Sequence, residues 1–136
     1  MAEKDYSGTP LATKLGIKDG HRVAFVNEPP GFRAALNLPG SVDVRPGARR
    51  RLDVAVLFVT RSAELRRRLP ALARAIFPDG GLWVAWPKKA AAVETDLFFD
   101  TVQRTGLDAG LVDNKSAAID DVYQGLRFVY RVGDRR

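Results

Sequence analysis

Three apolar runs of the chain end in polar or cationic residues that could bind a ligand. We interpret the runs as strands, and their carboxyl ends carry eight such residues: Asn27 and Glu28, then Thr60, Arg61 and Ser62, then Trp86, Lys88 and Lys89. In α/β proteins, ligands bind in the crevice outside the carboxyl ends of parallel strands. Lysine, arginine and a helix N-terminus suit a phosphate or carboxylate, and Trp86 would supply an apolar wall. We therefore expect these eight residues to line a crevice for a small anionic ligand.

Each of these residues also has an ordinary structural explanation, in which Ser62 only caps a helix, Trp86 belongs to the core and the lysines are solvated. No metal site is expected, because the chain has no cysteine and a single histidine, His21, which we place in a surface turn. The adjacent Asp120 and Asp121 would point to opposite sides of an extended chain, so they indicate a turn. We predict no catalytic residue and no cofactor.

Strands must position these residues, and the strongest candidate strand covers residues 54–59. It is apolar without alternation, which is typical of a strand covered on both faces in a parallel sheet. Shorter strands are predicted at 23–26 and 82–86, with a weaker one at 42–44. Parallel strands need crossover connections, so we expect helices between them.

The helix after residues 54–59 is the best defined. Its apolar stripe has helical spacing and consists of Leu65, Leu69, Leu72 and Ile76. We expect Ser62 to cap this helix and Pro70 to bend it. Two short helices are also predicted, one between a cap at Thr9 and a stop at Gly16, and one over residues 32–36.

A second crossover helix is predicted from a cap at Thr95 to about Thr105, with Gly106 just past its end. Three of its apolar residues are expected to face the sheet: Leu97, Phe98 and Val102. The last quarter of the chain predicts an antiparallel pair of strands, over about 109–119 and 126–132, that closes the sheet edge.

These elements together predict an α/β three-layer sandwich with a mostly parallel, Rossmann-like sheet and a C-terminal antiparallel hairpin. We expect one domain over residues 1–136, with residues 1–5 disordered. No apolar run approaches the ~20 residues that span a bilayer, and the start has no apolar signal segment. We therefore expect a cytoplasmic protein without membrane contact.

Arginine accounts for the net charge of +6. Residues 45–68 contain eight arginines and two acidic residues, while the rest of the chain is balanced. Arg66, Arg67 and Arg68 would surround the solvent side of their helix, and residues 49–51 would lie at the sheet edge opposite the crevice. The sequence lacks the interleaved aromatic residues that bind single strands. An arginine-mediated module that binds nucleic acid or an acidic protein is the alternative function.

The order of elements resembles the methyltransferase variant of the Rossmann fold, in which a helix and two strands follow the parallel core. Residues 15–24 are similar to the approach to that fold's first strand, and residues 77–84 to its segment of proline, acidic residue, two glycines and strand. The resemblance implies a divergent S-adenosylmethionine-dependent methyltransferase as a further alternative. A cradle for that cofactor needs glycines straight after the first strand, whereas residues 27–32 hold one glycine and two prolines. The acidic residue expected after the second strand is also missing, since Val44 leads to Arg45.

Several segments resemble an uncharacterised bacterial family known only as a domain of unknown function. They are YSGTPL at 6–11, KLGI at 14–17, LFVT at 57–60, WVAWPKK at 83–89 and TDL at 95–97. The resemblance spans nearly the whole chain and implies a small stand-alone bacterial protein, but it supplies no reaction. Our leading hypothesis is a non-catalytic domain of unknown function that binds a small anion with Arg61, Lys88 and Lys89.

Overall fold

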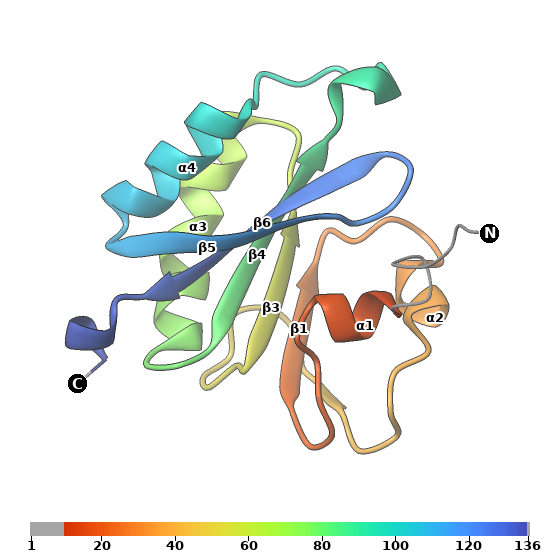
Figure 1. Cartoon of the computed structure of the whole chain (residues 1–136), viewed down its shortest axis with the longest axis vertical. Helices are drawn as coiled ribbons and strands as arrows, with labels where there is room; N and C mark the ends of the chain where they lie inside the picture. The colour runs from red at the N-terminus through yellow and green to blue at the C-terminus, as the bar shows by residue number, and fades with distance from the viewer. Residues whose placement is uncertain (1–9, 136) are drawn as a thin grey trace.

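The computed structural model describes residues 10–135, and Figure 1 shows its elements. The predictions for residues 1–5 and for a cap at Thr9 lie outside these residues. The helices are α1 (Leu11–Lys14), α2 (Phe32–Leu36), α3 (Ser62–Ile76) and α4 (Phe99–Asp108), with 3₁₀ turns η2 (Lys89–Ala91) and η3 (Val132–Asp134). The strands are β1 (Arg22–Val26), β2 (Asp43–Val44), β3 (Val54–Phe58), β4 (Gly81–Pro87), β5 (Leu111–Ala118) and β6 (Tyr123–Tyr130).

The strands of the described residues form one sheet in the order β2, β1, β3, β4, β6, β5. The first four run parallel, and β6 pairs antiparallel with both β4 and β5. Asp120 closes the turn between β5 and β6, because its carboxylate accepts hydrogen bonds from the N–H groups of Val122 at 2.8 Å and Tyr123 at 2.7 Å. The predicted α/β sandwich with a mostly parallel sheet and a C-terminal antiparallel hairpin is confirmed.

Hydrophobic cores lie on both faces of the sheet. Strand β3 is buried throughout, and its alternate side chains enter opposite cores. Val54, Val56 and Phe58 pack on the side of α1 and α2, whereas Ala55 and Leu57 pack on the side of α3 and α4. Figure 1 shows these two pairs of helices on opposite sides of the sheet. Burial on both faces explains why this strand is apolar without alternation.

Strand β4 carries both tryptophans of the chain, one in each core. Trp83 is fully buried on the side of α1, where its indole N–H donates a hydrogen bond to the carbonyl of Leu15 at 3.0 Å. Trp86 is buried in the core beneath α3 and α4. The Trp83 bond fixes the end of α1 against the middle of the sheet, because a buried indole N–H needs an acceptor.

The N-terminus of helix α3 is capped by a different residue than predicted. Arg61 occupies the N-cap position and Ser62 is the first helical residue, so the prediction that Ser62 caps the helix is wrong. The carboxylate of Asp96 takes this role, accepting hydrogen bonds from the N–H of Ser62 at 2.8 Å and from its hydroxyl at 3.0 Å. A carboxylate interacts with the helix dipole more strongly than a hydroxyl does. The helix continues through Pro70 to Ile76 with its apolar stripe buried.

Helix α4 begins later than predicted, at Phe99, so Thr95 is not its cap. The Thr95 hydroxyl instead donates a hydrogen bond to the carbonyl of Thr60 at 2.6 Å and accepts one from the N–H of Leu97 at 3.1 Å. Phe98 precedes the helix in an extended conformation and is 64% exposed. The prediction that Phe98 faces the sheet is therefore wrong, because the helical phase assumed for it starts too early.

Gly106 lies inside α4, so its predicted place just past the end of the helix is also wrong. The ring of Phe128, from β6, occupies the space in which a side chain at residue 106 would begin. Glycine is a weak helix former, and its presence here follows from the close approach of α4 to the sheet.

Candidate functional site

The carboxyl ends of β1, β3 and β4 meet at one edge of the sheet, toward the top of Figure 1, which we call the carboxyl edge. Seven of the eight residues predicted to bind a ligand follow these three strand ends, and Trp86 is the penultimate residue of β4. Their surroundings differ: five take part in contacts between loops and helices, and three line a cavity.

Asn27 and Glu28, which follow β1, contact neighbouring segments. The Asn27 side-chain amide donates hydrogen bonds to the carbonyl of Phe58 at 3.3 Å and to the carboxylate of Glu64 at 3.0 Å. The Glu28 carboxylate lies 2.6 Å from the guanidinium of Arg33. These bonds connect the loop after β1 with the end of β3 and with α2.

Thr60, Arg61 and Ser62, which follow β3, hold the segment that precedes α4. Thr60 and Ser62 do so through the hydrogen bonds described above, and the Arg61 guanidinium lies 3.6 Å from the exposed carboxylate of Glu94. The hydrogen bond from the Ser62 N–H lowers the pKa of Asp96 below its ordinary value, and the charge of Arg61 adds to this effect. Arg61 therefore already faces negative charge.

Trp86, near the end of β4, and Lys88 and Lys89, which follow this strand, line a cavity of about 260 Å³, which we call the β4 cavity. Its walls come from the segment before α4, the first residue of that helix and β6, and include Val93, Phe98, Phe99 and Gln124. The Lys88 N–H donates a hydrogen bond to the carbonyl of Val122 at 2.7 Å, which fixes the backbone beneath the two lysine side chains.

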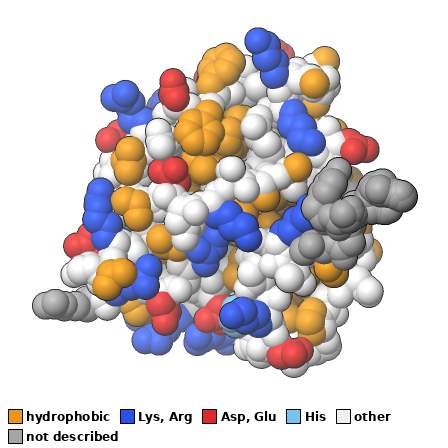
Figure 2. Space-filling view, in the orientation of Figure 1, with side chains coloured by type: hydrophobic (Ala, Val, Ile, Leu, Met, Phe, Trp, Pro, Cys, Tyr) orange, Lys and Arg blue, Asp and Glu red, His pale blue; other side chains and the backbone are white. Residues whose placement is uncertain are grey.

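The β4 cavity also exposes apolar side chains. Three of the five large hydrophobic residues that are exposed in the described part of the chain line it: Val93, Phe98 and Phe99. Figure 2 shows hydrophobic side chains gathered near the top of the molecule, in the region of the carboxyl edge. Lys88 and Lys89 form no ion pair with a carboxylate of residues 10–135. The cavity thus combines apolar walls with two cations, and sequence analysis missed Val93 and Phe98 because they lie outside the strand ends.

The position after β1, which holds the cofactor in dinucleotide-binding folds, is filled by aromatic packing. The ring of Phe32 packs edge-on against those of Phe25 and Phe58, with centroids 5.7 and 4.9 Å apart. Pro29 and Pro30 have no N–H to donate, and the Phe32 N–H is bonded to the carbonyl of Pro29 at 3.1 Å. This loop offers few free donors to a phosphate or a carboxylate.

The opposite edge, which we call the amino edge, gathers arginines that sequence analysis did not place together. Six arginine side chains line a hollow of about 700 Å³: Arg22, Arg45, Arg50, Arg51, Arg74 and Arg135. Figure 2 shows several Lys and Arg side chains along the lower edge, where the strands of Figure 1 begin. The helical arginines of residues 66–68 do not line it, and two of them pair with Glu64. The cluster of arginine in residues 45–68 was the only sequence signal for this site.

Within residues 10–135, no group of three or more histidine, aspartate or glutamate side chains could hold a metal ion. His21 lies in the turn before β1, where its Nδ1 accepts a hydrogen bond from the N–H of Lys18 at 3.2 Å. None of the helices in this part of the chain is long and apolar enough to cross a bilayer.

Solved structures of two methyltransferases and of LepI resemble this chain over most of its length. NcsB1, an O-methyltransferase from neocarzinostatin biosynthesis solved with S-adenosylmethionine and 2-hydroxy-5-methyl naphthoic acid, is 16% identical with a TM-score of 0.63; the match covers 95% of this chain and 54% of that one. A methyltransferase from Aquifex aeolicus is 15% identical with a TM-score of 0.61, covering 87% and 86%. LepI in complex with S-adenosylmethionine is 12% identical with a TM-score of 0.58, covering 96% and 49%. This chain has a methyltransferase-like Rossmann fold.

At these identities the likeness establishes the fold alone. The chain spans about half the length of LepI and of NcsB1. No protein-family model and no curated protein matches the sequence. Membership of an uncharacterised bacterial family therefore stays a prediction.

Proposed function

We propose that this methyltransferase-like domain binds a small amphipathic anion in the β4 cavity. The observation that carries the proposal is that Lys88 and Lys89 share this cavity with Trp86 and the exposed Phe98. Covering exposed apolar side chains with the apolar body of a ligand is favourable. The two ammonium groups would form charge-assisted hydrogen bonds with an anionic head group.

The size of the cavity limits the ligand. Its volume of about 260 Å³ lies below the roughly 300–1,000 Å³ of sites for drug-sized molecules. An aromatic carboxylate or a short acyl carboxylate would fit these limits, and neither needs a glycine cradle. Among the described residues that line the cavity, none forms a hydrogen-bonded pair of nucleophile and base, so we propose binding without catalysis.

Titration with benzoate and with hexanoate, followed by ligand-observed NMR, tests this function. In the variant Lys88→Gln/Lys89→Gln, affinity for benzoate should fall by about tenfold, which corresponds to ~1.4 kcal/mol. The control Lys14→Gln/Lys18→Gln removes the same charge outside the cavity and should bind as the wild type does. Absence of binding to the wild type, or an equal loss in both variants, would contradict the proposal.

The variant Phe98→Ser tests the apolar wall separately. It should weaken hexanoate binding without changing the melting temperature, because the Phe98 side chain is mostly exposed. Native mass spectrometry of freshly purified protein should show a co-purifying mass that the same substitution removes.

A second candidate function, a divergent S-adenosylmethionine-dependent methyltransferase, is favoured by the likeness to methyltransferase structures. The departures in the chain are the two prolines after β1 and Arg45 at the position expected to be acidic. Isothermal titration calorimetry with S-adenosylhomocysteine decides this candidate. Saturable heat of binding that persists in Lys88→Gln/Lys89→Gln would indicate a cofactor site away from the β4 cavity and would support the methyltransferase function. No heat of binding with the wild type would exclude this function.

A further inference from the structure

The hollow at the amino edge is lined by guanidinium groups from segments that lie far apart in the sequence. We call the six arginines and the space between them the arginine hollow. Arg22 begins β1, Arg45 follows β2, Arg50 and Arg51 precede β3, Arg74 lies in the last turn of α3, and Arg135 follows η3. The sheet brings these segments together, because its parallel strands begin at this edge, whereas α3 and the antiparallel β6 end there.

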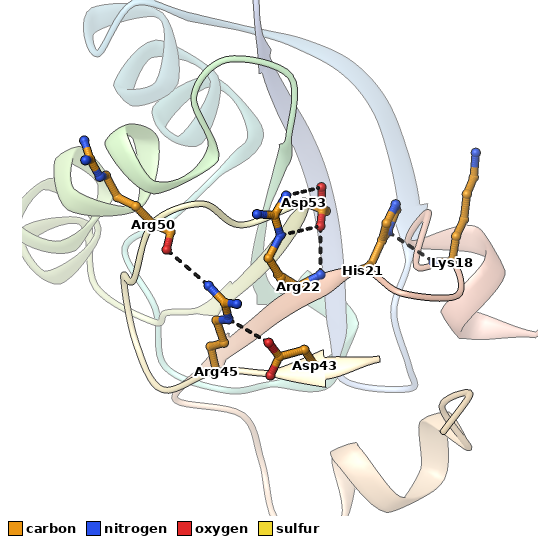
Figure 3. Close-up of polar contacts among 7 residues, drawn as sticks. All are labelled: Lys18, His21, Arg22, Asp43, Arg45, Arg50 and Asp53. Atoms are coloured by element: carbon orange, nitrogen blue, oxygen red, sulfur yellow. Dashed lines mark hydrogen bonds and ion pairs between the residues drawn. The ribbon is translucent and has the colours of Figure 1, made fainter. Parts of the chain in front are cut away.

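Carboxylates hold two of the six arginines in place, as Figure 3 shows. The Arg22 guanidinium donates hydrogen bonds to Asp53 at 3.2 and 3.4 Å, and Arg45 donates one to Asp43 at 2.9 Å. Arg45 also donates to the carbonyl of Arg50 at 3.2 Å, which ties the loop before β3 to the hollow. These bonds orient the cluster before any partner binds.

The other four arginines form no ion pair with a carboxylate of the described residues: Arg50, Arg51, Arg74 and Arg135. Positive charge extends beyond them to Arg127, whose guanidinium packs on Gly81. Burial and the nearby charge of Arg135 lower the pKa of this guanidinium. Like charges gathered in one place repel each other unless an anion compensates them. The positive charge of the amino edge therefore favours binding of a partner with several negative charges.

Aromatic rings lie among these arginines. A second hollow of about 480 Å³ adjoins the first and shares Arg50, Arg74 and Phe77 with it. It is also lined by Tyr130, whose ring packs edge-on against Phe77 with centroids 5.2 Å apart. The Tyr130 hydroxyl donates a hydrogen bond to the carbonyl of Ala73 at 2.7 Å, which fixes both rings. The fold thus supplies the interleaving of arginine and aromatic residues that is absent from the linear sequence.

We propose that the arginine hollow binds single-stranded nucleic acid through its phosphate backbone. Guanidinium groups match phosphate oxygens with paired hydrogen bonds, and the cluster contains arginine without lysine. Both hollows are open and share three lining residues, whereas sites for small molecules are enclosed and mostly apolar. Phe77 and Tyr130 would stack on bases, as aromatic residues do in grooves for single strands. The inference uses none of the residues of the β4 cavity and stands apart from the proposed function.

Fluorescence anisotropy with labelled single-stranded RNA and DNA of mixed sequence tests this inference over a range of salt concentrations. The variant Arg50→Gln/Arg51→Gln/Arg74→Gln should lose affinity by about tenfold or more. Its plot of log affinity against log salt should be less steep by about 2, since each phosphate contact on a single strand contributes ~0.7 to the slope. All three side chains are exposed, and an unchanged melting temperature would show that the fold is intact.

The control variant Arg66→Gln/Arg67→Gln/Arg104→Gln removes the same charge from the exposed faces of α3 and α4. It should bind within about twofold of the wild type and keep the wild-type salt slope. No binding by the wild type at low salt, or an equal loss in both variants, would overturn the inference. Competition by polyglutamate or by ATP as strong as that by unlabelled oligonucleotide would also overturn it, in favour of an acidic protein or of a small phosphorylated ligand.

Discussion

The two edges of the sheet hold their charged groups in opposite ways. At the carboxyl edge, the charged residues that follow β1 and β3 are paired with their neighbours, as Glu28 is with Arg33 and Arg61 with Glu94. At the amino edge, four of six arginines lack a described carboxylate partner. Paired charges therefore connect loops to one another, whereas charges without a partner mark where a ligand is expected. Lys88 and Lys89 are the exception at the carboxyl edge, and they line its cavity.

We expect the largest effect from replacing Gly106, which should lower the stability of the protein and weaken binding at the carboxyl edge but not at the amino edge. Gly106→Ala places a Cβ against the Phe128 ring and pushes α4 from the sheet, at an expected cost of about 1–3 kcal/mol. Urea denaturation measures this cost, and Gly133→Ala is the control because open space surrounds that glycine. Benzoate binding should weaken, since Phe98 and Phe99 stand at the start of α4, while binding at the arginine hollow should persist. A neutral Gly106→Ala would show that α4 adjusts freely.

Exchanging the variants between assays tests whether the edges act independently. The arginine-hollow variant should bind benzoate as the wild type does, and Lys88→Gln/Lys89→Gln should keep oligonucleotide affinity within about twofold. The physical reason is that the two sites share no residue. If each variant impaired binding in both assays, the two edges would form one continuous site or would share a loss of structure.

The smallest effect is expected from Asp53, the carboxylate that orients Arg22. Burial alone would raise the pKa of Asp53, but hydrogen bonds from the backbone and guanidinium of Arg22 outweigh burial and lower this pKa below its ordinary value. A carboxyl whose pKa is lowered by folding stabilises the folded state at pH values above its ordinary pKa, and this contribution is lost as the pH falls. Asp53→Asn should therefore cost about 0.5–1 kcal/mol near neutral pH, after solvent screening of the partly exposed pair.

Urea denaturation of wild type and Asp53→Asn across pH measures this contribution. The two curves should converge between about pH 5 and pH 2, where the wild-type carboxyl takes up its proton. A constant difference at all pH values would mean that shape, and not charge, makes Asp53 important. Oligonucleotide affinity should rise slightly in this variant, because the negative charge paired with Arg22 of the arginine hollow is removed.

The sheet and the residues of the carboxyl edge could be predicted from sequence because both depend on contiguous patterns. The apolar run that ends at Val59 and the one that ends at Trp86 each carry their own strand signal and are each followed by their candidate residues. The helix starts were mispredicted because a cap can come from a distant segment, as Asp96 does for Ser62. Local preference cannot show a partner that lies 34 residues away.

The arginine hollow could not be predicted because tertiary structure creates it. Arg74 looks like one more cation of a solvated helix, and Arg135 like one of a charged terminus. Only the tertiary fold, in which α3 and the antiparallel β6 end at the edge where the parallel strands begin, brings both beside Arg50. Phe77 and Tyr130 stand 53 positions apart, so the sequence gives no sign that they pack together.

The placement of Trp83 and Trp86 on opposite faces of β4 gives each hydrophobic layer its own intrinsic fluorophore. Trp86 also lines the β4 cavity, so its emission should respond to an occupant there while that of Trp83 should not. Single-tryptophan proteins made by Trp83→Phe and Trp86→Phe would thus report unfolding of the two layers separately. Coincident transitions would show that the sheet unfolds as one cooperative unit.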